Sequence, residues 1–414
     1  DSNTIKTCRI SGSIRQLARN NRMNSGPEAV SASGRQADTA KNMLFADKKL
    51  FPAFFLFLLS ALSLTAGGNG VPAEKRILYI NSSNSTYLWC SNNNIGFRTH
   101  LQESGIPASI DTVELNVYTA PALKPDPEEI EALREQLRTR NYDLIVTLDN
   151  PAADLFFSGQ LELPPGTALV FSGYNAAESG LPPRKPGMTG LTVPSSNRQN
   201  LELGRRLWPE AREVAILTDG SAGGLNLHDR LKRTPPGRPG ITIRLINGSE
   251  YTTAEMLNQI AAMPKESFVI LNNWGSSKRE PKEPFFAIFS KLTDANPNPV
   301  LLARENRFEV GVVGGFFVPG KQHGGETAAL AARILNGENP DAIKVKTAGI
   351  LPIFDYEALR KFSIPVDKLP PGSLLAGLPP PFTTQYRTEL AVAGSLSGAL
   401  LVFMLLNYIS SSRR

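Results

Sequence analysis

The chain has 414 residues, of which 44 are Lys or Arg and 38 are Asp or Glu, so its formal net charge is +6. Residues 1–49 contain nine basic and four acidic residues and therefore carry +5 of that charge. The remainder is close to neutral, which excludes the broad basic surface that nucleic-acid binding requires.

The N-terminal end predicts a leader followed by a secretory signal. Residues 1–42 are polar and show no helix or strand period, so we interpret them as disordered or as an overlong start. Residues 43–66 combine the basic pair Lys48-Lys49 with a short apolar stretch and small residues, which is the pattern of a signal peptide. An uncleaved anchor is the alternative. Cleavage would remove Cys8 and leave Cys90 alone, so we expect no internal disulfide.

Residues 71–189 show the alternation of strands and helices that is typical of a parallel sheet. Continuous apolar runs predict buried strands at 76–80, 143–148 and 168–172. Between the first two runs, Asp126 is a candidate N-cap and Pro127 suits the first helical position, so a helix begins there. These elements define a first lobe.

After a Pro- and Gly-rich break at 181–187, the same alternation starts again in residues 190–310. Strands are predicted at 214–218, 241–246, 268–271 and 300–303, and helices at 199–207, 225–231, 253–263 and 284–293. Strands that alternate with helices imply right-handed crossovers and parallel sheets. We therefore expect an α/β fold in which two doubly wound sheets form a two-lobed clamshell.

The C-terminal end predicts a transmembrane helix over residues 390–409. This apolar run contains only one strongly polar residue, Asn407, and is long enough to span a hydrocarbon core of about 30 Å. A buried core helix is the alternative. Arg413 and Arg414 follow the run, and basic residues mark the cytoplasmic side, so the lobes are expected outside the cytoplasm. Residues 366–388 would then be a juxtamembrane connector.

Two glycines in this span suggest a partner. Gly394 and Gly398 form a Gly-x-x-x-Gly pair on a face with little side-chain bulk, so two such helices could approach closely. We predict a homodimer through this face. A chance occurrence is the alternative, because glycine is common in membrane helices.

Four segments near the C-terminal end resemble a known family. They are Gly311–Gly315, Gly324–Pro340, Phe354–Phe362 and Leu369–Ser373. Together they look like the ABC-transporter substrate-binding-protein-like sensor module that lies outside many bacterial membrane histidine kinases. The resemblance extends weakly over residues 75–388.

This resemblance implies a type I periplasmic-binding-protein fold in the periplasm, anchored to a bacterial inner membrane. Residues 311–365 would return to the first lobe and form the hinge. Closure on a small molecule would pass through the membrane helix to a cytoplasmic signalling output, in cis or in trans. A membrane-tethered solute-binding protein of an ABC-type transporter is the alternative function.

In such a fold, a ligand is expected at the carboxyl ends of the strands, facing the cleft. Residues after the predicted strands offer amides, hydroxyls, carboxylates, a guanidinium and aromatic rings, which suit a small polar organic ligand. The predicted ligand-binding residues are Asn81, Ser82, Tyr87, Asn150, Tyr174, Asp219, Trp274 and Glu305. The same loops also contain Ser83, Asp149, Ser172, Gly173, Gly220, Ser221, Asn272, Asn273, Arg304 and Asn306. Turn, cap or core roles are the alternative for each.

Enzyme signatures are absent from the sequence, so we expect a binding protein without catalytic residues or cofactor. The three histidines, His100, His228 and His323, are isolated and have no metal-site spacing. The segment Asp219–Gly224 places its serine wrongly for a nucleophile elbow, and no phosphate-binding loop is found. A hydrolase on a two-lobed fold is a distant third possibility.

Overall fold

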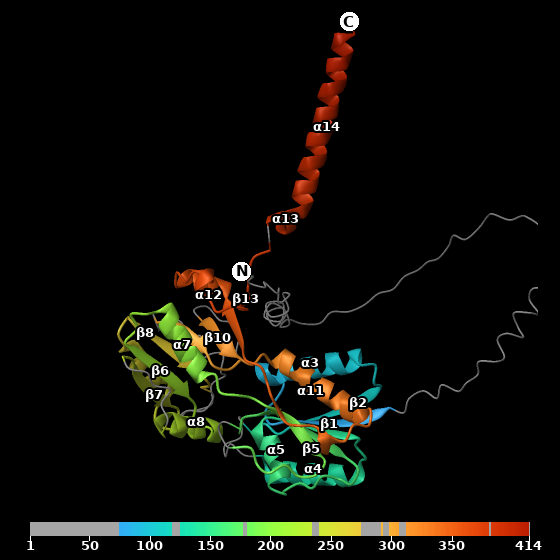
Figure 1. Cartoon of the computed structure of the whole chain (residues 1–414), viewed down its shortest axis with the longest axis vertical. Helices are drawn as coiled ribbons and strands as arrows, with labels where there is room; N and C mark the ends of the chain where they lie inside the picture. The colour runs from blue at the N-terminus through green and yellow to red at the C-terminus, as the bar shows by residue number, and fades with distance from the viewer. Residues whose placement is uncertain are drawn as a thin grey trace, which may run out of the picture.

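The structure is a computed structural model. It describes residues 74–117, 125–176, 180–233, 240–274, 291–292, 298–305, 312–380 and 382–413. Within these residues, the chain forms two β-sheets flanked by helices and one long C-terminal helix that projects away from them (Figure 1). The predicted leader 1–42, the signal peptide 43–66 and most of the predicted helix 284–293 lie outside the described residues.

The first lobe is a six-stranded sheet in the order β11-β5-β4-β3-β1-β2, with every pairing parallel. Its strands are β1 Lys75–Asn81, β2 Ala108–Glu114, β3 Leu144–Leu148, β4 Ala168–Tyr174, β5 Met188–Thr192 and β11 Lys346–Thr347. Its helices are α3 Leu88–Glu103, α4 Pro127–Thr139, α5 Asn150–Phe157 and α11 Gly320–Leu335. Asp126 caps α4 by accepting a hydrogen bond from the Glu128 backbone N–H at 2.9 Å, which confirms the predicted helix start.

The second lobe is a seven-stranded sheet in the order β13-β12-β10-β9-β8-β6-β7. Its strands are β6 Glu213–Thr218, β7 Thr242–Asn247, β8 Ser267–Leu271, β9 Val300–Leu302, β10 Val312–Phe317, β12 Leu351–Asp355 and β13 Leu374–Ala376. Its helices are α7 Asn197–Leu207, α8 Ala222–Arg233, α9 Thr253–Ala261 and α12 Tyr356–Lys361. All pairings are parallel except β10 with β12.

Each sheet has a hydrophobic core on both faces, as a doubly wound fold requires. In β1, Leu78 and Ile80 belong to one buried cluster, whereas the intervening Tyr79 belongs to another. In β6, Val214 and Ala215 divide in the same way between two clusters of the second lobe. Successive strand residues point to opposite faces, so these continuous apolar runs fill two cores at once.

The chain crosses between the lobes three times within the described residues: after β5, between β10 and α11, and between β11 and β12. This differs from the prediction that residues 311–365 return to the first lobe. Only α11 and β11 do so, whereas β10, β12 and α12 build the second lobe. The 366–388 segment also differs from a simple connector, because β13 pairs with β12 before the chain leaves the lobe.

Glycine explains the β10 arrangement. Gly314 has φ +111°, and a Cβ added there would lie 2.2 Å from the Ile353 carbonyl oxygen of β12. The glycine-rich segment therefore marks a close approach of two strands inside the second lobe, and the crossover follows it at 318–319.

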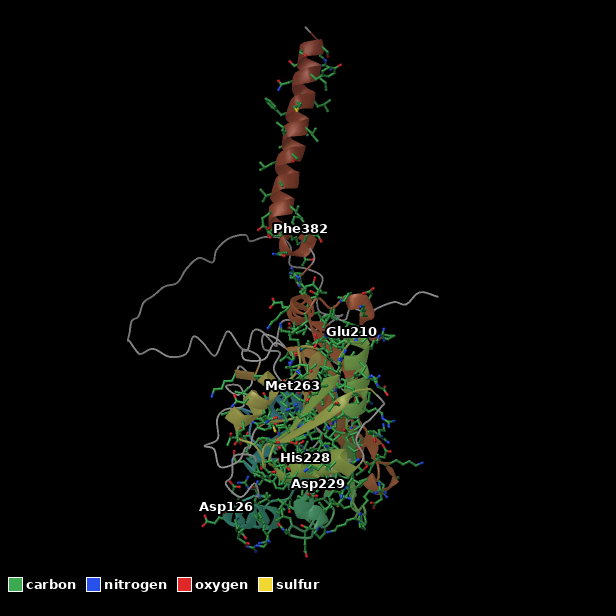
Figure 2. The ribbon with its side chains drawn as sticks, turned by 90° about the vertical axis from the view of Figure 1, so that its left-hand side faces the viewer. Asp126, Glu210, His228, Asp229, Met263 and Phe382 are labelled. Atoms are coloured by element: carbon green, nitrogen blue, oxygen red, sulfur yellow. The ribbon has the colours of Figure 1, made fainter. Side chains whose placement is uncertain are left out.

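The C-terminal helix α14 runs from Arg387 to Ser412 and contains the predicted span 390–409. Its apolar stretch is not buried against the other described residues, and by length and composition α14 is a candidate membrane span. A short helix, α13 Phe382–Gln385, precedes it, and Figure 2 shows Phe382 at its base, on the side of the second lobe.

Candidate ligand-binding site

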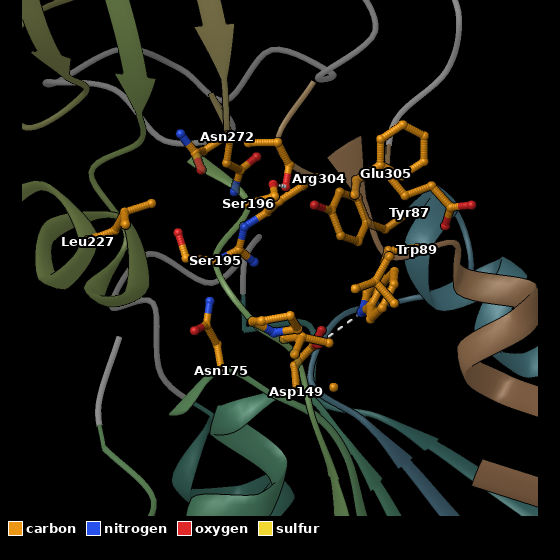
Figure 3. A pocket seen from close by; sticks show the side chains of 17 residues that line it. Tyr87, Trp89, Asp149, Asn175, Ser195, Ser196, Leu227, Asn272, Arg304 and Glu305 are labelled. Atoms are coloured by element: carbon orange, nitrogen blue, oxygen red, sulfur yellow. Dashed lines mark hydrogen bonds between the residues drawn. The ribbon is translucent and has the colours of Figure 1, made fainter. Parts of the chain in front are cut away.

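A pocket that opens to solvent lies between the lobes, next to the crossovers. Its walls come from strand ends and loops of both sheets (Figure 3). Small-molecule sites in such folds typically lie at the carboxyl ends of parallel strands. The position of this pocket and the residues that line it make it the candidate site.

Three aromatic rings line the pocket. Tyr87 precedes α3, Trp89 lies in the first turn of α3, and Phe317 ends β10. Tyr87 and Trp89 are half-buried, so ring surface remains that a ligand could cover. Burial raises the pKa of Tyr87 well above its usual value, although Arg304 opposes the shift. The phenol is therefore neutral at physiological pH and can donate a hydrogen bond.

Asp149 supplies a carboxylate from the first lobe. It follows β3 at the N-cap position of α5, in a backbone conformation with φ 68° that is rare for a non-glycine residue. Its Oδ1 accepts a hydrogen bond from the Trp89 indole Nε1–H at 2.8 Å (Figure 3). Strained backbone at such a site is often associated with function, because the surrounding structure must hold it in place.

The second lobe supplies a cation and three further polar side chains. Arg304 and Glu305 follow β9, while Asn272 and Asn273 follow β8. Asn272 exchanges two side-chain hydrogen bonds with Asn197, at 2.9 and 3.0 Å. These contacts hold the Asn272 side-chain amide in place at the edge of the pocket. Arg304 is the one cationic side chain among the described residues that line the pocket.

Glu305 links the lobes, because its Oε1 accepts a hydrogen bond from Asn92 Nδ2 of α3 at 3.0 Å. The residue as a whole is partly exposed, but its Oε2 atom is buried. Burial raises the pKa of Glu305 to about 7, against the opposing effects of the Gly320 backbone N–H, Asn92 and Lys321. This carboxyl group therefore changes its charge near neutral pH.

A smaller pocket of about 340 Å³ adjoins the first one, with which it shares Leu227, Asn272, Asn273 and Arg304. Asp219 lines it, with only 2% of its surface exposed. The Asp219 carboxylate accepts hydrogen bonds from Ser221 Oγ at 2.5 Å and from Asn273 Nδ2 at 2.7 Å. Asp219 therefore holds Asn273, a residue that lines both pockets, in place.

The eight predicted residues take different places in the structure. Tyr87 and Glu305 line the main pocket, and Asp219 lines the adjoining one. Asn150 lies behind the wall, where its Oδ1 accepts a hydrogen bond from the Asn175 backbone N–H at 2.7 Å, and Asn175 itself lines the pocket. A ligand-binding role for these four residues stays a prediction.

Asn81 and Ser82 are fully buried in the first lobe. Ser82 Oγ donates to the Leu148 carbonyl at 2.6 Å and accepts from the Ala152 backbone N–H at 2.9 Å, so it joins the end of β3 to α5. Asn81 Oδ1 accepts from Asn94 Nδ2 at 3.4 Å. The structure gives both residues internal roles, in contrast to the prediction.

Tyr174 and Trp274 also differ from the prediction, because each is only 1% exposed and belongs to a hydrophobic core. The Tyr174 hydroxyl donates to Asp154 at 3.0 Å, and Trp274 Nε1–H donates to Thr253 Oγ1 at 3.3 Å. The register shifts between Phe171 and Tyr174, so the tyrosine turns back onto the core face of the sheet.

Several residues that line the pocket were missed or only partly anticipated. The loops after the predicted strands do include Asp149, Gly173, Asn272, Asn273 and Arg304. Trp89 and Phe317 were not anticipated, and neither was the crossover segment 193–196. The position of Trp89 two residues after Tyr87 is the signal that could have identified it.

Within the described part of the chain, no group of three or more His, Cys, Asp or Glu side chains is placed to hold a metal ion.

Solved structures with the same fold support the two-lobed description. A conserved domain protein from Vibrio cholerae O1 biovar El Tor has a TM-score of 0.53 at 18% identity, covering 73% of this chain and 99% of its own. A Streptococcus pneumoniae ABC domain in complex with L-Trp has a TM-score of 0.53 at 15% identity, covering 72% and 100%. A ligand-free, open substrate-binding protein with adhesive properties from Clostridium difficile has a TM-score of 0.51 at 16% identity, covering 73% and 99%.

No curated protein matches the chain. Residues 90–367 match the protein family described as ABC transporter substrate binding protein. This segment includes most of both lobes and all the residues that line the main pocket except Tyr87 and Trp89. The chain therefore belongs to the ABC transporter substrate-binding-protein family, as a ligand-binding domain with a periplasmic-binding-protein fold.

Proposed function

We propose that the chain is the ligand-binding part of a membrane-anchored receptor whose two lobes close on a small zwitterionic molecule carrying a planar ring. The observation that carries this proposal is the mixed lining of the pocket. Tyr87, Trp89 and Phe317 offer ring faces, while Arg304 and Asp149 offer opposite charges. A ligand that has a ring and both charges would use every part of this lining.

L-Tryptophan is the natural first probe, since it combines these groups and occurs in the S. pneumoniae structure that shares the fold. Its carboxylate would pair with Arg304 and its ammonium group with a pocket carboxylate. Its indole would lie against the aromatic wall of the first lobe.

The role in signalling rests on the C-terminal helix. A sensor of the histidine-kinase type needs a span to carry lobe movement from the periplasm across a bacterial inner membrane, and α14 has suitable length and hydropathy. Dimerisation through Gly394 and Gly398 would let a change in the lobes alter the crossing of two helices. Apart from the adjoining backbone of α14 itself, a Cβ added at either glycine would meet none of the described residues within 4 Å, so this face is open.

A membrane-tethered solute-binding protein is the second candidate. The family description names ABC transporters, and this observation favours a transport role. Co-purification from native membranes separates the two. A kinase or other signalling output supports the receptor, and a transporter permease supports the alternative.

Calorimetry on the full chain in lipid nanodiscs tests the ligand class. L-Tryptophan would be compared with L-alanine, which lacks the ring, tryptamine, which lacks the carboxylate, and indole-3-propionate, which lacks the ammonium group. We expect each analogue to bind at least about tenfold more weakly, since tenfold corresponds to only 1.4 kcal/mol. Equal binding of any analogue would remove the corresponding group from the proposal, and no binding of any compound would refute the ligand class.

A further inference from the structure

We infer that His323 is a positioning residue that holds the Trp89 indole in place as the ring-binding wall of the pocket. This inference rests on the proposed function, because the wall is useful only to a ligand that carries a ring. His323 lies in α11, one turn after the second crossover, whereas Trp89 lies in α3. Its side chain does not line the pocket, so it would act on the ligand only through the tryptophan.

The Trp89 ring is held on an edge and on one face. Its Nε1–H donates to Asp149 Oδ1 at 2.8 Å, which fixes the edge. Its face stacks on the His323 imidazole, with ring centroids 5.4 Å apart and an interplanar angle of 24°. The indole also lines the pocket and is only half-buried. A ring fixed in this way loses little freedom when a ligand stacks on it.

His323 is itself held from the first-lobe sheet. Its Nε2 accepts a hydrogen bond from the Gly173 backbone N–H at 2.8 Å and lies 3.0 Å from Ser172 Oγ. A backbone N–H can only donate, so Nε2 must be the unprotonated nitrogen, and the proton of the neutral ring is on Nδ1. Burial lowers the pKa of His323 to about 4, which agrees with a neutral imidazole.

Gly173 joins these contacts into one cluster. Besides donating to His323, it has φ +69°, and an added Cβ would lie 2.8 Å from Asp149 Oδ1 and 3.4 Å from the Trp89 ring. The missing side chain therefore makes room for both the indole and the carboxylate that holds it. His323 of α11 and Gly173 near the end of β4 therefore both contribute to the position of the Trp89 ring.

A purely structural role for His323 explains less of this geometry. Ser172 and Thr327 already join β4 to α11, with their hydroxyl oxygens 2.7 Å apart. His323 Nδ1 is buried and has no hydrogen-bond partner among the described residues, which is an unfavourable arrangement for a residue that only fills space. A flat ring parallel to the indole, with an acceptor toward Gly173, is what the positioning role requires.

The first test needs no ligand. Full chain labelled with 5-fluorotryptophan would be studied by ¹⁹F NMR in nanodiscs, with the Trp89 resonance assigned from Trp89→Phe. Loss of the stacked imidazole removes its ring current and so shifts the Trp89 resonance in either His323 variant, which makes line width the readout. In His323→Ala the Trp89 resonance should broaden or split, while those of Trp208 and Trp274 keep their line widths. His323→Gln keeps a flat group and an acceptor, so its Trp89 line width should match wild type, and His100→Ala, an exposed histidine of α3, is the matched control. An unchanged Trp89 line width in His323→Ala would overturn the inference, and so would equal broadening in all variants.

The second test uses L-tryptophan as the probe. His323→Ala should weaken its binding about tenfold and His323→Gln by less than threefold. In the Trp89→Ala background, His323→Ala should cause no further loss, because the histidine acts through the missing ring. Additive losses in the double variant would refute the positioning role. If wild-type protein binds no L-tryptophan, the proposed ligand class fails, and the ¹⁹F result still decides whether His323 positions the ring.

Discussion

The two walls of the pocket differ in kind. The first lobe presents flat surfaces, Tyr87 and Trp89, and holds the second of these with a carboxylate and an imidazole. The second lobe presents Arg304, Glu305 and two asparagines, which can exchange hydrogen bonds and charge with a ligand. The first lobe therefore selects mainly by shape and the second mainly by charge, while the Asp149 carboxylate of the first lobe and the Phe317 ring of the second complement each wall. A ligand that engages only one wall gains little from closure.

Among these predictions, the largest change in free energy is expected for Trp274, a buried residue of the second lobe that does not line the pocket. Trp274→Ala should lower the free energy of unfolding by about 3–5 kcal/mol, because it empties a core site. Chemical denaturation would measure this loss. L-Tryptophan affinity of the remaining folded protein should be unchanged. Weaker binding with normal stability would show that Trp274 contacts the ligand.

The contribution of charge from the second lobe is tested most directly at Arg304. Arg304→Met should reduce L-tryptophan affinity by about 2–3 kcal/mol, because the ligand carboxylate loses a charged hydrogen-bond partner. Tryptamine, which has no carboxylate, should lose none of its affinity. Arg230→Met, on an exposed position of α8, is the control, and calorimetry is the measurement. Equal losses for both compounds would mean that Arg304 acts on the fold.

The contribution of the aromatic surface of the first lobe is tested at Trp89. Trp89→Ala should weaken L-tryptophan by about 1–2 kcal/mol through loss of an aromatic contact and should not affect L-alanine. Trp208→Phe, outside the pocket, should change neither. If L-alanine loses as much as L-tryptophan, the two walls do not divide shape and charge.

Glu305, which joins the walls, gives the smallest effect. Its pKa is raised from 4.5 to about 7, so its contribution to stability is present at low pH and is lost as the pH rises through that range. Glu305→Gln should melt like wild type at pH 5 and roughly 2–4 °C higher at pH 8. The reverse order at pH 8 would show that the ionised carboxylate stabilises the fold.

The sequence predicts the sheets well because buried parallel strands leave continuous apolar runs, such as those in β1, β3 and β6. Loops after these strands contain Asp149 and Arg304, which the structure brings together in the pocket. Strand ends therefore indicate the edge of the sheet where a ligand lies. Which side chains face the ligand depends on details that periodicity does not carry.

Helix α3 illustrates what a pattern-based prediction misses. The sequence of α3 includes three consecutive asparagines, Asn92 to Asn94, and Gly96, all poor helix formers, and tertiary packing against α11 overrides these preferences. Because α3 was missed, so was Trp89. Tyr174 was misplaced for another reason, since the irregularity at Gly173 turns its side chain toward the core.

The most direct test is the distance between the lobes with and without ligand. Spin labels at Glu128→Cys of α4 and Asp229→Cys of α8, both exposed, would report this distance by pulsed electron paramagnetic resonance. Cys8 would be replaced by Ser in this background, and Cys90 is buried. L-Tryptophan should shorten the distance in wild-type background and fail to do so in Arg304→Met. An unchanged distance at saturating L-tryptophan would contradict a ligand held between two closing walls.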